Sequence, residues 1–447
     1  MSELDDWRTE AGRHLDWQAG RARAYLGYYH GESQVIALME QEERQAFRRL
    51  LDESHANWAE LVIKAVAERL TVAGFRFGAS TDQAWLIWQA SRMDADHKLV
   101  QNDALVTGHG FALVQPDEAN PTGVSITAES PLEATVLYAP GSRRRRVAAY
   151  KRFMDDPGDP GGQTTEVLIL PDVIATWRGA GGEPELAPNP AGLVGMIEIR
   201  PQPETMGPPR SELDGVMSTL DRIHTTIFNR MVATDYAAFR QAWATGVKLA
   251  RRTITDAEGG EHQELVRPYD VGANRLLINE NPDGRFGSFP ESTLRGYLDA
   301  VEQDVHTMAA ISQTPPHYLL ATMVNLAADA IKAAEAGLVS KCAQRALFIG
   351  EDWEEVARVA LTLVGDPGAA DVEGEVVWRD WETRSQGQLV DALVKLATIG
   401  VPREVLWERA GASPQEIDRW RDMAAREAAA APPAPAPAPA PPAPAPA

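Results

Sequence analysis

The sequence lacks the residues and runs that mark several common protein classes. It has one cysteine, Cys342, among 447 residues, which excludes an internal disulfide framework and a multi-cysteine zinc site. Cys342 lies in an apolar helical pattern, which predicts a buried, inert thiol. No run of eighteen apolar residues occurs, so we expect no membrane-spanning helix. The first residues, MSELDDW, are acidic and lack the apolar core of a signal peptide.

Short catalytic and metal-binding motifs are missing as well. No G-x-x-x-x-G-K-[ST] loop occurs, which argues against an ATPase motor of the P-loop kind. Neither H-E-x-x-H nor a paired C-x-x-C is present. The nine histidines are scattered, and His109, between two glycines at a helix-to-strand turn, fits a structural role better than a ligand role. We therefore predict no metal site, no cofactor and no catalysed reaction.

Basic charge is also in deficit. The chain carries 43 Lys and Arg against 64 Asp and Glu, a net charge of −21. A protein that grips DNA by neutralising phosphates is expected to be basic, so this balance argues against a transcription factor or a DNA-wrapping protein. It does not exclude a protein past which DNA slides, where an acidic wall would reduce sticking, and it is equally explained by acidity that only keeps the protein in solution. The four arginines at 143–146 favour a hairpin tip, or a patch for an acidic neighbouring subunit, over a phosphate site.

The first half of the chain predicts an α+β unit. Residues 1–24 are polar with scattered tryptophans and give no clear fold signal. Apolar residues at helical spacing predict helices at about 33–51, 54–70 and 82–106. Short segments with Gly and Pro punctuation, from TVAGFRFG to TTEVLILPDVIATWRG, predict strands of an antiparallel sheet packed on these helices. Residues 25–210 are expected to form this unit.

Two long amphipathic helices are predicted in the centre of the chain. The first opens at Ser211 in the manner of a capping box and extends over 211–246. The second covers 291–312 and has an apolar stripe at spacings of three and four. Between them, 247–290 contains turn signals and short predicted strands such as VKLAR and NRLLINE.

A double-proline break follows the second helix. Pro315 and Pro316 remove two backbone donors and push the chain out of a helix. After Asn325, a helix N-cap candidate, an alanine-rich helix is predicted over 326–366. Residues 367–427 then predict a strand, EVVWRDWE, and short helices at about 385–398, 402–409 and 414–428. From Ala428 onward only Ala and Pro remain, a composition expected to be disordered or polyproline-like.

A helix leading into SQTPPHYLL, followed by an alanine-rich helix ending in LFIGEDWEEVARVAL, resembles the portal proteins of tailed bacteriophages. Among these, the chain is most similar to portal proteins of long-tailed phages of actinobacteria, over about residues 25–425. The resemblance implies a portal-like α+β fold with an α+β wing, long stem helices, a small β-containing clip and a helical crown. The implied parts are an N-terminal arm at 1–24, the wing at 25–210, stem helices at 211–246 and 291–312, the clip at 247–290, a tunnel loop at 313–325, a wing helix and return at 326–366, the crown at 367–427 and a disordered tail at 428–447.

The resemblance also implies a function and partners. The chain would be one subunit of a homo-oligomeric ring, a dodecamer, assembled in the host cytoplasm and set at the unique vertex of the capsid. Double-stranded DNA would pass through the ring during packaging and ejection. The ring would bind the terminase large subunit, the head–tail connector or adaptor, and the major capsid and scaffolding proteins. It would act without a cofactor, a metal or a membrane.

Three sets of site residues follow from this resemblance. The stem face at Asp299, Glu302 and His306, with spacings of three and four, would line the channel with negative charge. The start of the clip offers possible contacts to DNA phosphates at Lys248, Arg251 and Arg252. The tunnel loop would point into the channel with Thr314, Pro315, Pro316, His317, Tyr318, Leu319, Leu320, Thr322 and Met323.

Other interpretations stay open at this point. The stem face could instead form salt bridges with Arg222 or Arg230 of a neighbouring subunit. The double-proline segment could be a plain loop between helices. The whole chain could be a metal-dependent nuclease, a terminase-related enzyme or a cellular α+β binding module.

Overall fold

A computed structural model shows a mixed helix and sheet protein, which confirms the α+β class. It divides into two compact units, a larger one formed by residues 1–32, 57–220 and 306–447 and a smaller one formed by 33–56 and 221–305. None of the helices in the described part is both long and apolar enough to cross a membrane. The residues described are 3–32, 48–50, 53–54, 56–77, 81–156, 158, 161–179, 182–238, 242–245, 251–255, 261–265, 283–288, 293–320, 328–381, 386–412 and 414–430.

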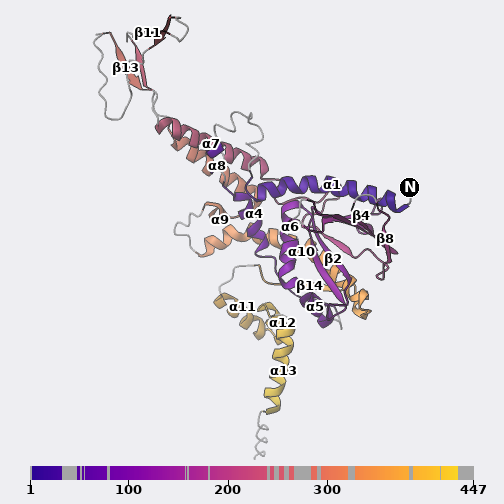
Figure 1. Cartoon of the computed structure of the whole chain (residues 1–447). Helices are drawn as coiled ribbons and strands as arrows, with labels where there is room; N and C mark the ends of the chain where they lie inside the picture. The colour runs from indigo at the N-terminus through magenta and orange to yellow at the C-terminus, as the bar shows by residue number, and fades with distance from the viewer. Residues whose placement is uncertain are drawn as a thin grey trace, which may run out of the picture. The chain divides into compact units, whose positions relative to one another are not determined.

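Two antiparallel sheets form the centre of the larger unit (Figure 1). The five-stranded sheet has the order β4-β5-β6-β7-β8, and the three-stranded sheet has the order β3-β2-β9. Apolar side chains of both sheets share one core, so the sheets pack face to face. The strands are β2 (Gly110–Pro116), β3 (Val124–Glu129), β4 (Ala134–Tyr138), β5 (Arg146–Met154), β6 (Thr164–Ile169), β7 (Val173–Arg178), β8 (Glu185–Pro188) and β9 (Met196–Ile199).

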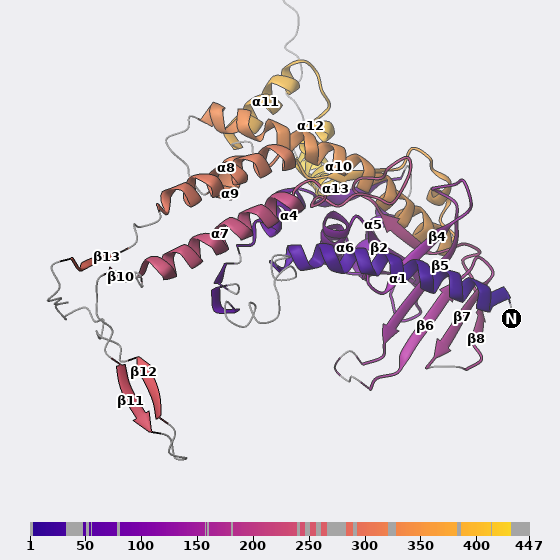
Figure 2. The same ribbon diagram turned by 90° about the horizontal axis from the view of Figure 1, so that it is seen from above.

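The first residues form a long helix, α1 (Glu3–Tyr29), where no fold signal was predicted. Figure 2 shows α1 lying across the five-stranded sheet. On β5, Ala148 and Tyr150 pack with Ala11 and Leu15 of α1, whereas Ala149 packs in the core between the sheets. This alternation gives each face of the sheet its own apolar cover. The helix escaped prediction because much of its buried stripe is alanine, which contrasts weakly with the polar residues around it.

The helix predicted at 82–106 is two helices, α5 (Thr81–Ala90) and α6 (Met93–Thr107). Arg92 lies between them with φ 61°, a left-handed conformation that interrupts the helical path. α6 ends at Gly108, where φ is 88° and a β-carbon would lie 2.8 Å from the Pro209 carbonyl oxygen. This close approach explains why a glycine precedes His109.

The alanine-rich helix is α10 (Ala328–Leu363), which packs against β2 and β9. Trp353 of α10 is fully buried and meets Trp88 of α5 edge-on, with ring centroids 5.1 Å apart. The buried thiol of Cys342, on the same helix, has its pKa raised to about 11 by desolvation. The predictions of a helix here and of a buried cysteine are both confirmed.

The strand predicted within 367–427 is β14 (Glu375–Trp378), and it pairs with β1 (Val72–Arg76) in an antiparallel two-stranded sheet. This strand is therefore joined by hydrogen bonds to the segment assigned to the wing. The short helices that follow are α11 (Gln386–Thr398), α12 (Arg403–Arg409) and α13 (Pro414–Ala430). Their positions agree with those predicted.

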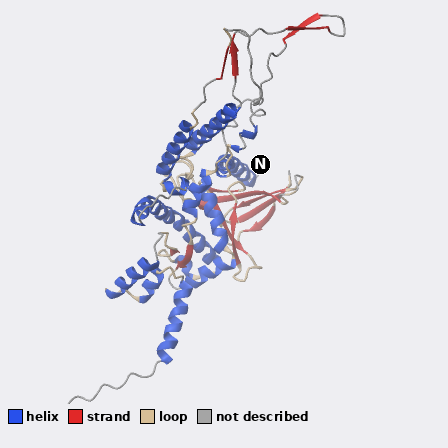
Figure 3. Cartoon of the chain, turned by 90° about the vertical axis from the view of Figure 1, so that its left-hand side faces the viewer, coloured by secondary structure: helices blue, strands red, loops and turns tan. Residues whose placement is uncertain are grey.

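The smaller unit contains most of two long helices and four short strands (Figure 3). The helices, α7 (Met217–Ala238) and α8 (Arg295–Ser312), are shorter than the predicted 211–246 and 291–312. The Ser211 backbone N–H donates to the Asp214 carboxylate, so the expected capping contact forms, but turns precede the helix proper. Strand β10 (Ala242–Thr245) pairs with β13 (Arg285–Ser288), and β11 (Arg251–Thr255) pairs with β12 (Glu261–Leu265). The strand predicted at NRLLINE lies outside the described residues.

Candidate functional site

The polar face of α8 carries the predicted row of Asp299, Glu302 and His306. All three residues are exposed, and none has a hydrogen-bond or ion-pair partner within the described ranges. Elsewhere on the helix surface, Val305 and Met308 are both fully buried. The row is thus a solvated face of an anchored helix.

The Arg222 side chain is already paired within the chain. Its Nε and one terminal nitrogen donate to Asp304 Oδ1 at 2.9 and 2.7 Å. One interpretation paired Arg222 with the acidic stem face of a neighbouring subunit. In this structure, the Arg222 guanidinium already has a partner on α8 of its own chain.

α8 ends in a defined cap. Gln313 has φ 53°, and the Thr314 N–H donates to the Ala309 carbonyl at 3.0 Å. This is the hydrogen-bond pattern of a Schellman motif, here built on a residue other than glycine. The Lys341 ammonium of α10 donates to the Ser312 carbonyl at 2.9 Å and neutralises the negative end of the helix.

A buried ionic cluster lies at this point, which we call the root cluster: Glu212, Ser312, Lys341 and Arg345. Glu212 Oε2 lies 2.7 Å from the Lys341 ammonium, and Oε1 accepts a hydrogen bond from Arg345. Burial alone would raise the pKa of Glu212, but these two cations hold it below its usual value. Through these contacts, α10 holds the turn that precedes α7, at Glu212, and the C-terminal end of α8, at Ser312.

The double-proline segment is a short helix, α9 (Pro316–Leu320), and not an open loop. Pro316 is its first residue, a position where proline's missing N–H costs nothing. Thr314 and Leu319 are buried, and the Leu319 carbonyl accepts a hydrogen bond from the Trp58 indole at 3.2 Å. Trp58 opens α4 (Trp58–Ala67).

Tyr318 is half-exposed but anchored. Its hydroxyl accepts from Arg69 at 2.9 Å and lies 3.3 Å from Glu335 of α10. Pro315 is buried, and Pro316 is exposed beside the half-buried His317 and Leu320. Thr314, Pro315 and Leu319 therefore pack into the larger unit. That this segment points into a channel stays a prediction. Thr322 and Met323 lie outside the described residues.

The predicted phosphate contacts are only partly described. Arg251 and Arg252 stand on β11 opposite Leu265 and Glu264 of β12. Lys248 lies outside the described residues. His109, in turn, is buried and bonded through Nδ1 to Glu198 at 2.6 Å.

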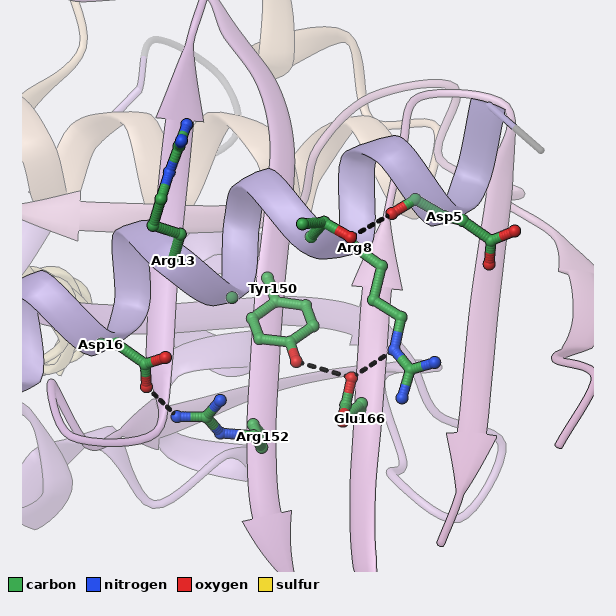
Figure 4. A pocket seen from close by; sticks show the side chains of 9 residues that line it. Asp5, Arg8, Arg13, Asp16, Tyr150, Arg152 and Glu166 are labelled. Carbon is green, nitrogen blue, oxygen red and sulfur yellow. Dashed lines mark hydrogen bonds and ion pairs between the residues drawn. The ribbon is translucent and has the colours of Figure 1, made fainter. Parts of the chain in front are cut away.

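Sequence reasoning missed a charged hollow of about 420 Å³ between α1 and the five-stranded sheet. Figure 4 shows Arg8 and Tyr150 converging on Glu166, at 2.5 and 2.7 Å. Arg152 pairs with Asp16 nearby. The hydrogen bond from Arg8 holds the pKa of Glu166 below its usual value, and burial raises the pKa of Tyr150. These groups pair with one another, so the hollow ties α1 to the sheet.

The described residues thus form an α+β protein in which the charged groups of the root cluster and of the hollow beside α1 pair with one another, whereas the long helix α8 presents an exposed acidic face. Among them, no group of three or more His, Cys, Asp or Glu side chains is arranged to hold a metal ion. Comparison with known proteins adds the family: the phage portal proteins of the SPP1 Gp6-like type match residues 13–430, and the chain belongs to this family.

Two relatives agree with this assignment. The chain is 29% identical over 395 residues to the portal protein of Mycobacterium phage L5, covering 84% of this chain and 80% of the relative. It is 29% identical over 397 residues to the portal protein of Mycobacterium phage D29, covering 83% and 80%. The resemblance read from the sequence is confirmed, and neither the nuclease, the terminase-related enzyme nor the cellular binding module is favoured. Portal proteins are structural components of phage particles, placed at the capsid.

Proposed function

We propose that the chain is one subunit of a closed ring, a dodecamer, at the unique capsid vertex. The observation that carries this proposal is the family match, which extends over nearly all of the chain from residue 13 to residue 430. In the ring, double-stranded DNA passes through a central channel during packaging and ejection. The terminase large subunit, the head–tail connector and the major capsid and scaffolding proteins bind its outer surfaces.

The acidic face of α8 is the proposed channel lining. Asp299 and Glu302 are exposed and lack a partner within the described part of the chain, so their charge is available to a passing polyanion. Repeated in every subunit, this face forms a negative wall that repels phosphates and keeps DNA from sticking. Its support is the contrast with Asp304 on the same helix, which is neutralised by Arg222.

The segment at 313–325 has two proposed parts, a buried part that fixes the loop and a part that contacts DNA. Thr314, Pro315 and Leu319 anchor the tunnel loop against the larger unit. The exposed Pro316 and the residues that follow α9, Thr322 and Met323 among them, would meet DNA. Lys248, Arg251 and Arg252 would contact phosphates at the mouth of the channel.

Electron microscopy and light scattering of the purified protein test the ring. We expect closed rings with a central hole, because a ring buries apolar side chains that α8 leaves exposed, such as Leu298 and Ile311, each 50% exposed. A protein that scatters as a monomer across a wide concentration range, under conditions where it is folded, contradicts the proposal.

A further inference from the structure

Three adjoining hollows in the larger unit form one groove beside α1. The central hollow has a volume of about 480 Å³. It shares His14 and Trp17 with a hollow of about 300 Å³, and Tyr138 and Arg143 with one of about 440 Å³. We call this the α1 groove, and its principal residues are His14, Trp17, Tyr138, Arg143, Arg200 and Pro203.

The groove presents aromatic rings held in fixed positions. The Trp17 side chain is 49% exposed, which is unusual for the largest apolar residue. The Arg21 guanidinium lies 5.2 Å from the centre of the Trp17 ring, and that of Arg200 lies 5.7 Å from the Tyr138 ring. Rings fixed in this way lose little conformational entropy when a ligand packs on them.

The polar groups of the groove leave hydrogen-bond donors to spare. Both oxygens of the Glu198 carboxylate are engaged, because one binds His109 at 2.6 Å and the other accepts from the Tyr138 hydroxyl at 2.8 Å. The Arg143 side chain is exposed, and within the described residues its one bond is to the Glu204 carbonyl. The Trp17 indole N–H has no hydrogen-bond partner among the residues that the structure describes. This N–H and the remaining donors of Arg143 are available to a ligand rich in acceptors.

We propose that the α1 groove binds the Ala/Pro segment of this chain, residues 431–447, which directly follows α13. This segment has nine prolines and eight alanines, so it offers a carbonyl at every residue but an N–H at fewer than half. Its composition favours the polyproline helix, which is preformed and docks on aromatic-lined grooves. At about 3.1 Å per residue it would extend for about 50 Å. Its carbonyl oxygens match the remaining N–H donors of the Arg143 guanidinium.

The test uses the full-length chain with all nine tail prolines replaced by serine, so that the groove is vacant, and a fluorescein-labelled peptide of residues 431–447. We expect fluorescence anisotropy to show saturable binding, weakened about tenfold by Trp17→Ala because this variant loses an aromatic contact with the peptide. Arg143→Ala provides a second variant that leaves the packing of α1 intact and is also expected to weaken binding.

The controls distinguish specific binding in the α1 groove from nonspecific binding of the peptide. Trp420→Ala, at a tryptophan 37% exposed on α13, should leave the affinity unchanged, and the chain with its natural tail should bind the peptide more weakly because its own tails compete. No binding at millimolar peptide, binding unaffected by both Trp17→Ala and Arg143→Ala, or equal binding of a serine-substituted peptide would overturn the proposal.

Discussion

The root cluster and the outer face of α8 use charge in opposite ways. In the root cluster, the side chains of Glu212 and Lys341 are each 3% exposed and meet at 2.7 Å. On α8, Asp299 and Glu302 stand in solvent without a partner in the described part of the chain. Buried charge is tolerated only where it is paired, whereas unpaired charge must stay in water. The paired charges of the root cluster therefore stabilise the fold, whereas the exposed carboxylates of α8 are available to interact with another molecule.

Removing one partner from the root cluster should give the largest loss of stability. Glu212→Ala leaves two cations buried without an anion, which costs about 3–5 kcal/mol of the free energy of unfolding. Denaturant unfolding measures this loss, with Glu351→Ala, an exposed carboxylate on α10, as the matched control. A loss below about 1 kcal/mol in Glu212→Ala would show that the cluster is not a tie. Replacing Glu212, Lys341 and Arg345 together by apolar residues should recover much of the stability.

A buried and an exposed histidine extend the same comparison to pH. Burial lowers the pKa of His97 from 6.5 to about 4, so the unfolded chain binds this proton more readily than the folded one. Stability is therefore full above pH 6.5 and falls as the pH drops towards 4, by about 3 kcal/mol at most. We expect His97→Gln to flatten this part of the profile of unfolding free energy against pH. Replacing the exposed His306 by Gln should leave it unchanged, and equal effects of the two variants would refute the assignment.

Substitutions in the C-terminal cap of α8 should change the free energy of unfolding by a smaller amount. Gln313 adopts φ 53°, so Gln313→Gly should raise the free energy of unfolding by about 0.5–1 kcal/mol, because glycine reaches this conformation without strain. Gln313→Val is the matched change in the other direction, since a β-branched residue is strained there. Thermal unfolding of the three proteins should rank them Gly, Gln, Val, and the reverse order would contradict the role of the cap.

Patterns local in sequence were predictable, and contacts between distant segments were not. The strands from β2 to β7, the helices α8 and α10 and the break at Pro315 follow from periodicity and proline chemistry. By contrast, β1 pairs Val72 with Trp378, and no local pattern announces a partner so far along the chain. The root cluster likewise joins residues that the sequence separates widely.

Single side chains could also mislead. The stripe of α1 is too poor in large apolar residues to stand out, and Arg92 breaks a helix whose apolar spacing continues through it. At the candidate site, the spacing of Asp299, Glu302 and His306 was enough to place them on one face. The burial of Leu319 could not be foreseen, because α9 packs against α4, a segment far away in the sequence.

The claim that the open face of α8 lines a channel is tested most directly by reversing its charge. Asp299→Lys with Glu302→Lys should leave ring assembly intact, because neither residue has a partner among the described residues to lose. Glu183→Lys with Glu185→Lys, on exposed residues before and at the start of β8, adds the same charge elsewhere and serves as the control. In a DNA-packaging assay at low salt, the account predicts that the α8 variant slows or stalls and that the control packages normally. The defect should ease as salt screens the new attraction to phosphates. Intact rings of the α8 variant that package DNA at the normal rate at low salt would contradict the account, and so would a failure of the rings to form.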